Sequence, residues 1–205
     1  MKLYHLTSGP LRVNSYFVVN EQTNEAVLID GAENYKLIKN VEEKYGFKIV
    51  AELLTHAHFD HAGNAKKLQD DGVKIYIGKK DADKLSNDLN LGSSFGRKFE
   101  YLTPDFTLDD EEIVEIAGLK FLVVLTPGHT DGSVCYICED MLFSGDTLFK
   151  GTVGRTDFPT GDRGEMVKSV NKLLSMDFDY KVYPGHEEAT TLFFERKNNM
   201  FSEFE

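Results

Sequence analysis

Residues 55–61 read T-H-A-H-F-D-H and place three histidines and one aspartate within six residues. The run A-E-L-L directly before them belongs to a predicted buried strand over 49–55. So many ionisable side chains make a poor core and an unusual surface loop. Imidazole and carboxylate groups hold zinc, iron or manganese while leaving a position open for water. The stretch therefore predicts a metal site at the end of a strand.

Three further motifs repeat this arrangement later in the chain. His129 follows F-L-V-V-L-T-P-G, Asp146 follows M-L-F-S-G, and His186 follows K-V-Y-P-G. Strand ends followed by glycine-containing loops are where functional side chains are commonly mounted at one edge of a sheet. We therefore expect these three side chains to join the histidines of residues 55–61.

The spacing within the motif suggests two ions. His56 and His58, two apart on a short loop, can bind one ion, and Asp60 and His61 come from the next turn and can serve a second. Ions about 3.5–4 Å apart need a bridging group, and a carboxylate with two oxygens suits that role. Asp146 is the best candidate for the bridge.

The rest of the chain alternates strand-like and helical patterns, and only 88–104 carries no readable pattern. Helices are predicted at 34–45 with a stop at Gly46, 62–70, 80–87, 163–174 and 190–197. Strands are predicted at 12–19, 26–31, 49–55, 73–77, 113–116, 119–125, 133–138, 141–144 and 180–183. Strand-rich runs with a few helices in each half indicate a layered α/β plan, two sheets face to face with helices outside, in one domain over 1–205.

Composition narrows the partners and the compartment. The apolar fraction is 41%, which suits a real core, and the formal net charge is −11. Such a surface repels phosphate backbones and anionic lipid, so we expect a small-molecule substrate and neither nucleic acid nor membrane. The N-terminus lacks the apolar core of a signal peptide, so the cytoplasm is the expected compartment. The sequence does not indicate an oligomeric state.

Cys135 and Cys138 form a C-x-x-C spacing that is typical of some redox sites. Their segment reads as a strand leading into a turn, where positions three apart point to opposite faces. A redox pair usually lies at a helix N-terminus. We therefore predict two ordinary strand cysteines.

The set T-H-A-H-F-D-H, T-P-G-H-T, S-G-D-T-L-F and Y-P-G-H resembles the metallo-β-lactamase-fold hydrolases in order and spacing, from residue 26 onward. The resemblance implies a four-layer αββα sandwich with metals at one edge. It implies one ion on His56, His58 and His129, a second on Asp60, His61 and His186, and Asp146 as the bridge. Asp30, which ends V-L-I-D, matches a family position that supports the metal loop; a simple turn-forming role is the alternative.

Such a site implies hydrolysis with two divalent ions, most simply zinc, with iron or manganese as alternatives. A water shared by both ions loses its proton near neutral pH, about 7 against 15.7 for bulk water, and can attack a carbonyl as a bridging hydroxide. Asp60 and Asp146 are the expected catalytic carboxylates, with Asp60 helping to move the proton.

The loop F-K-G-T-V-G-R-T-D-F-P-T-G-D, residues 149–162, bears on the substrate. Arg155 is suited to a substrate carboxylate, and pairing with Asp157 or Asp162 is an equal alternative. The loop resembles the G-R-T-D-F-P signature of compact glyoxalase II-like hydrolases. This implies a thioester substrate such as S-D-lactoylglutathione, with Arg155, Asp157 and Phe158 as binding residues.

Two other functions remain open. Persulfide dioxygenases share G-R-T-D-F but use one iron held by two histidines and one aspartate; the retained His186 and Pro159 favour the hydrolase. A non-catalytic metal-binding or electron-transfer domain is the third possibility, and metal count with activity separates the three.

Overall fold

Two six-stranded sheets form the centre of the computed structural model, which describes residues 1–32 and 34–202. The first has the order β1 (Lys2–Ser8), β2 (Val13–Asn20), β3 (Glu25–Ile29), β4 (Lys48–Leu54), β5 (Lys74–Gly78), β6 (Phe106–Leu108). The second has the order β14 (Thr190–Thr191), β13 (Lys181–Pro184), β10 (Met141–Gly145), β9 (Val134–Cys138), β8 (Leu119–Leu125), β7 (Ile113–Ile116). A small hairpin joins β11 (Leu148–Phe149) and β12 (Thr152–Val153).

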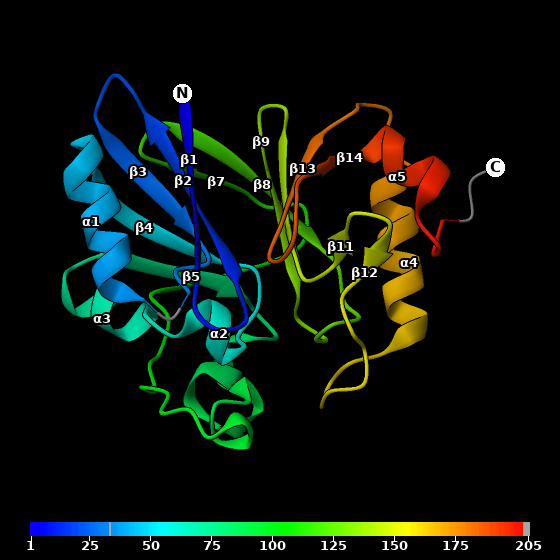
Figure 1. Ribbon diagram of the computed structural model, residues 1–205, viewed down its shortest axis with the longest axis horizontal. Coiled ribbons are helices and arrows are strands. Elements are labelled where there is room, and N and C mark those ends of the chain that lie inside the picture. Colours follow the sequence, from blue (N-terminus) through cyan, green and yellow to red (C-terminus); the bar gives the residue numbers. More distant parts are fainter. Residues whose placement is uncertain (33, 203–205) are drawn as a thin grey trace.

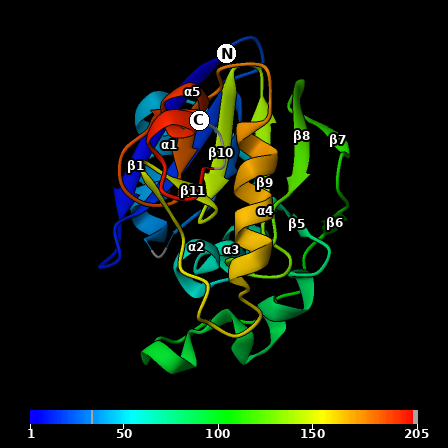
Figure 2. The same cartoon turned by 90° about the vertical axis from the view of Figure 1, so that its right-hand side faces the viewer.

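Helices cover the outer face of each sheet (Figure 1). The first sheet carries α1 (Tyr35–Tyr45) and α3 (Ala65–Asp70), with the short α2 (Phe59–Ala62) at its edge, and the second carries α4 (Arg163–Leu174) and α5 (Leu192–Asn198). Figure 2 shows α4 lying over the strands of the second sheet. This arrangement confirms the predicted αββα sandwich.

Three apolar clusters separate the four layers. The middle one lies between the sheets and includes Phe121, Tyr136 and Phe143, all fully buried. Ile38 and Leu68 anchor the cluster under α1 and α3, and Met166, Val170 and Leu173 anchor the one under α4. Each such side chain contributes about 1.5–3 kcal/mol on burial. Packing on both faces of each sheet therefore fixes where its strands end.

Strand direction brings distant loops to one edge. β3, β4 and β5 run parallel to one another, and β10 runs parallel to β13. β8 points the same way as β10 because both are antiparallel to β9. The loops after these strands carry the predicted site residues Asp30, His56, His129, Asp146 and His186.

Helix ends follow local capping. The Asn34 side chain accepts a hydrogen bond from the backbone N–H of Leu37 and begins α1. Gly46 ends it with φ of 72°, a left-handed conformation that glycine adopts without strain. The stop predicted at Gly46 is confirmed.

Three predicted helices differ from the structure. The helix predicted at 62–70 begins later, as α3 at Ala65, and Ala62 instead ends α2; the Asn64 side chain between them donates to the carbonyls of Gly31 and Ala32. Residues 80–87 form a 3-10 helix, Ala82–Ser86, and two more 3-10 turns follow at Asp88–Asn90 and Ser93–Phe95. The start of 190–197 pairs with β13 as β14 before α5 begins. In each case tertiary contacts override local pattern.

The two cysteines are free and buried on opposite faces of β9. Cys135 lies in the cluster under α4 and Cys138 between the sheets, as predicted. Burial raises the pKa of the Cys135 thiol to about 11 and that of Cys138 to about 12. A redox thiol needs the opposite shift. Within residues 1–32 and 34–202, no helix is long and apolar enough to cross a membrane.

Glu52 is a fully buried carboxyl on β4 whose Oε1 accepts the Gly31 N–H at 2.7 Å. Burial raises its pKa from 4.5 to about 8. Between these values the folded chain keeps a proton that the unfolded chain has lost, so stability falls as pH rises, by about 1.4 kcal/mol per pH unit. We expect Glu52→Gln to remove this loss, and therefore to gain stability over the wild type between pH 5 and pH 8 in urea unfolding of metal-free protein.

The exposed Glu43→Gln is the matched control and should show no such gain. An equal difference between Glu52→Gln and the wild type at both pH values would mean that Glu52 is ionised in the folded protein.

Candidate metal centre

The first group of side chains contains three buried histidines from two loops. One ring nitrogen of each of His56, His58 and His129 lies within 4.8 Å of the others. His58 Nδ1 is 2.9 Å from His129 Nε2. His56 and His58 follow β4 in the first sheet, whereas His129 follows β8 in the second. The group therefore forms only when the sheets pack together.

The second group contains Asp60, His61 and His186, again with one atom each within 4.8 Å. His61 Nε2 lies 3.3 Å from His186 Nε2, and Asp60 Oδ2 lies 3.6 Å from His186 Nε2. Asp60 and His61 come from α2, and His186 follows β13. These are the two sets that the family resemblance implied, and His56, His61 and Asp146 form a further group that joins them.

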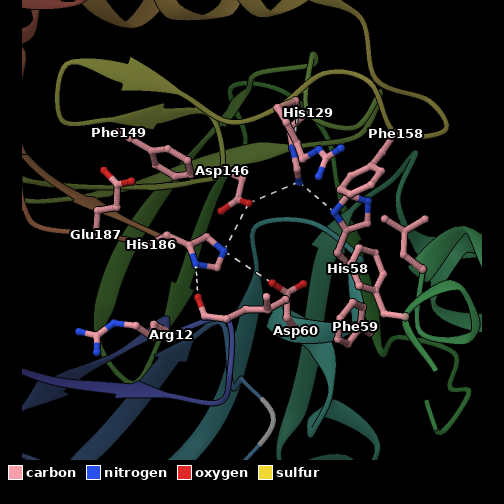
Figure 3. Close-up of a pocket in the computed structure, with 14 residues that line it drawn as sticks. Arg12, His58, Phe59, Asp60, His129, Asp146, Phe149, Phe158, His186 and Glu187 are labelled. Atoms are coloured by element: carbon pink, nitrogen blue, oxygen red, sulfur yellow. Dashed lines mark hydrogen bonds and ion pairs between the residues drawn. The ribbon is translucent and has the colours of Figure 1, made fainter. Parts of the chain in front are cut away.

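Asp146 lies between the two groups (Figure 3). Its Oδ2 is 3.5 Å from His129 Nε2 and 3.6 Å from His186 Nε2, while Oδ1 is 3.4 Å from His61 Nε2. One carboxylate thus faces histidines of both groups, which is the geometry that a bridging ligand requires.

Asp30 orients two of the rings from outside. Its Oδ2 accepts the Nδ1–H of His61 at 2.9 Å and the hydroxyl of Thr55 at 2.8 Å. The Thr55 oxygen in turn lies 3.1 Å from His56 Nδ1. Both rings therefore turn Nε2 inward, which is how carboxylates orient metal-bound histidines.

Backbone carbonyls orient two other rings. His129 Nδ1 donates to the carbonyl of Arg155 at 2.7 Å, and His186 Nδ1 donates to the carbonyl of Leu11 at 2.9 Å. A carbonyl can only accept, so each Nδ1 carries a proton and each Nε2 faces the centre.

The centre contains buried polar atoms without a protein partner. His56 Nε2 and Asp146 Oδ1 make no hydrogen bond within the described part of the chain. Leaving such atoms unpaired costs about 1–3 kcal/mol each. Divalent ions would satisfy both atoms, so the residues present fit a dinuclear site.

Charges differ between the two groups. Burial, and then the neighbouring histidines, lower the pKa of His56 well below its usual value; burial lowers that of His58 to about 3. Burial alone would raise the pKa of Asp146, but His61 and the other histidines lower it strongly. His56 and His58 therefore offer neutral nitrogens, and Asp146 an ionised carboxylate between the two groups.

The centre opens into a cavity of about 520 Å³, within the usual range for small-ligand pockets. Aromatic rings form one wall: Phe95 lies 5.3 Å from Phe59 and 5.9 Å from Phe158 between ring centroids. Phe158 is also 5.8 Å from the His58 ring. The opposite side carries Arg12 and Glu187 (Figure 3).

Arg155 lines the cavity but is already paired. Its guanidinium binds Asp157 through two hydrogen bonds of 2.7 and 2.6 Å and lies 3.8 Å over the Phe158 ring. Asp157 is outside the cavity lining, and Asp162 instead caps α4 through the Glu165 N–H. The alternative pairing with Asp157 is thus the one present, and Phe158 lies against the cavity.

Sequence reasoning missed several residues here. Leu91 and Phe95 line the cavity from the stretch that carried no readable pattern, and nothing in the sequence signals them. Asn14 donates to the carbonyls of Pro184 and Glu187 and so fixes both sides of His186. Its position as a polar residue inside an apolar strand was the available signal.

Two packed sheets with histidine and aspartate groups at one edge define a metal-dependent hydrolase of the αββα class. The sequence model of the metallo-beta-lactamase superfamily matches residues 8–186. The chain belongs to this superfamily. Among curated proteins it is 35% identical to the hydroxyacylglutathione hydrolase GloC of Haemophilus influenzae, over 92% of each chain.

Solved structures agree. The chain resembles BLEG-1, described as a B3 metallo-beta-lactamase, with a TM-score of 0.93, 33% identity and coverage of 98% of this chain and 100% of the other. It also resembles TTHA1623 in a di-iron-bound form, with a TM-score of 0.86 and 32% identity over 97% of this chain and 99% of the other. A third similar structure is ETHE1 from Myxococcus xanthus, with a TM-score of 0.80 and 25% identity over 98% of this chain and 84% of the other.

Proposed function

We propose that the protein hydrolyses a 2-hydroxyacyl thioester such as S-D-lactoylglutathione with two divalent ions. The observation that carries the dinuclear proposal is Asp146, whose two oxygens face histidines of both ligand groups. Similarity to GloC over nearly the whole chain supports the thioester. Zinc is the proposed metal. Iron and manganese use the same ligand types, and the di-iron-bound form of TTHA1623 supports iron as an alternative.

Bound ions would acidify a water and polarise the substrate carbonyl. The chain's own groups then have separate tasks. Asp60 borders the centre, and although burial alone would raise its pKa, His61 and His186 lower it, so it is ionised and able to accept a proton. Phe158 and Phe95 exclude water from one side of the cavity. Arg155 stands at the rim, suited to a carboxylate on the leaving thiol.

The test pairs metal analysis with an S-D-lactoylglutathione assay. We expect two ions per chain and hydrolysis that chelation abolishes. One iron per chain with oxygen uptake on glutathione persulfide would establish a dioxygenase instead. Two bound ions with no hydrolysis of any thioester or lactone would support a non-catalytic metal domain. A β-lactam belongs in the assay as second candidate substrate because of the likeness to BLEG-1.

Arg155 allows a sharper prediction about substrate binding. If it binds the substrate carboxylate, Arg155→Ala should raise KM about tenfold or more, because a charge-assisted hydrogen bond contributes about 1.5–3 kcal/mol. Asp157→Asn, which leaves the arginine free, should keep or lower KM. Steady-state kinetics of both variants decide this. If both substitutions raise KM equally, the pair only stiffens the loop.

A further inference from the structure

Asp81 is a fully buried carboxylate that none of the steps above uses. It follows β5 in the first sheet, and its backbone N–H donates to the Gly78 carbonyl at 2.9 Å. It lies under the first histidine group rather than in the cavity, and it is not among the residues that line that cavity. Its contacts therefore concern the loops that carry the histidines.

The carboxylate holds both of those loops. Asp81 Oδ2 accepts the backbone N–H of Ala57, the residue between His56 and His58, at 2.9 Å. Both of its oxygens lie 3.0 Å from the hydroxyl of Thr130, the residue after His129. One side chain thus joins a loop of the first sheet to a loop of the second, directly beside all three histidines.

Lys84 fixes the carboxylate in turn. Its ammonium lies 2.5 Å from Asp81 Oδ1, 2.9 Å from the Lys80 carbonyl and 2.5 Å from Asp131 Oδ1. The 3-10 turn explains the pairing, because side chains three residues apart eclipse there. Lys84 is also buried, so the pair is shielded from water and costly to break from one side.

Backbone packing leaves the carboxylate no room to move. A Cβ on Gly132 would lie 2.4 Å from Asp81 Oδ1 and 2.5 Å from its backbone nitrogen, and a Cβ on Gly78 would lie 2.5 Å from the Gly132 carbonyl. Glycine at both positions lets the turn after β5 press against the loop after His129. The contact is therefore built into the fold.

The second group is held by other residues. Asp30 holds His61, and the carbonyl of Leu11 holds His186. Neither of these contacts involves Asp81 or Lys84. Asp30 also reaches His56 through the Thr55 hydroxyl, so Asp30 serves both groups, whereas the contacts of Asp81 concern the first group alone.

The geometry points to Asp81, fixed by Lys84, as the positioning residue that aligns the two histidine loops of the first ion site, while the second site is aligned without it. This inference rests on the proposed dinuclear site but not on the choice of substrate.

The test is metal affinity in Asp81→Asn, which keeps the size of the side chain but removes its charge. Losing an orienting partner of metal ligands typically costs about 10–100-fold in metal affinity. We expect that loss at one of two sites, read by titrating metal-free protein with Co²⁺ and following its absorption, and by metal content after dialysis. Asp131→Asn removes the other carboxylate on Lys84, which has no hydrogen bond to Ala57 or Thr130 in the described part of the chain, and this variant should bind two ions normally.

Each outcome of these metal titrations either supports or overturns the inference. Two ions bound with wild-type affinity, or equal weakening at both sites, would overturn the inference. Should Asp81→Asn fail to fold, Thr130→Val decides, because it removes the hydroxyl that donates to the carboxylate and keeps the ion pair. Weakening at one site supports the inference, and two unchanged sites overturn it. If the wild-type protein binds no metal, the proposed function itself is contradicted.

Discussion

Asp146→Ala is expected to lose both bound ions and to reduce kcat/KM by about 10³-fold or more. The carboxylate faces His129 and His186 with one oxygen and His61 with the other. Without it, two divalent ions held by these groups would repel each other with no shared anion between them. The lost stabilisation of several kcal/mol converts to at least three orders of magnitude in rate. Metal content and steady-state kinetics measure the two effects.

Asp140→Ala is the matched control, because it removes a partly exposed carboxylate that pairs only with Lys181 in the described part of the chain. It should keep both ions and full activity. Full activity with two bound ions in Asp146→Ala would refute the bridging role and with it the dinuclear assignment.

The residues of the ligand groups could be predicted from the sequence for a physical reason. His56, His129 and His186 each follow an apolar strand run, and parallel strands that end at one edge bring such residues together. Charged side chains in short loops after buried strands have few structural uses. Chain order and residue chemistry were therefore sufficient to group them.

The residues that surround the site could not be predicted from the sequence, because their positions depend on contacts between loops. Phe95 reaches the cavity from 3-10 turns that have no periodic pattern. Arg155 had two equally reasonable partners, and only the folded loop shows that Asp157 holds it. Asp81 stands three residues after the strand run I-Y-I-G, whereas Asp146 directly follows S-G, so the position of Asp81 alone did not mark it. Residues that act through other residues lack a chemical signature of their own.

Gly185→Ala should impair the metal centre as a steric effect alone. A Cβ at this position would lie 2.5 Å from Asp146 Oδ1 and 2.6 Å from His61 Cε1, far inside ordinary contact distance. These atoms belong to the proposed bridging carboxylate and to a histidine of the second group, so the added methyl must displace the carboxylate or the ring. A displacement of about 1 Å in a catalytic group costs on the order of 10²-fold in rate.

The measurement is kcat/KM together with metal content, set against Gly46→Ala. Gly46 has φ of 72° and no atom within 4 Å of an added Cβ, so that control costs about 1 kcal/mol of backbone strain and leaves the centre intact. The two variants therefore separate lost stability from a displaced ligand. Wild-type metal content and rate in Gly185→Ala would show that Asp146 and His61 can move without consequence, and the proposed ligand geometry would have to be abandoned.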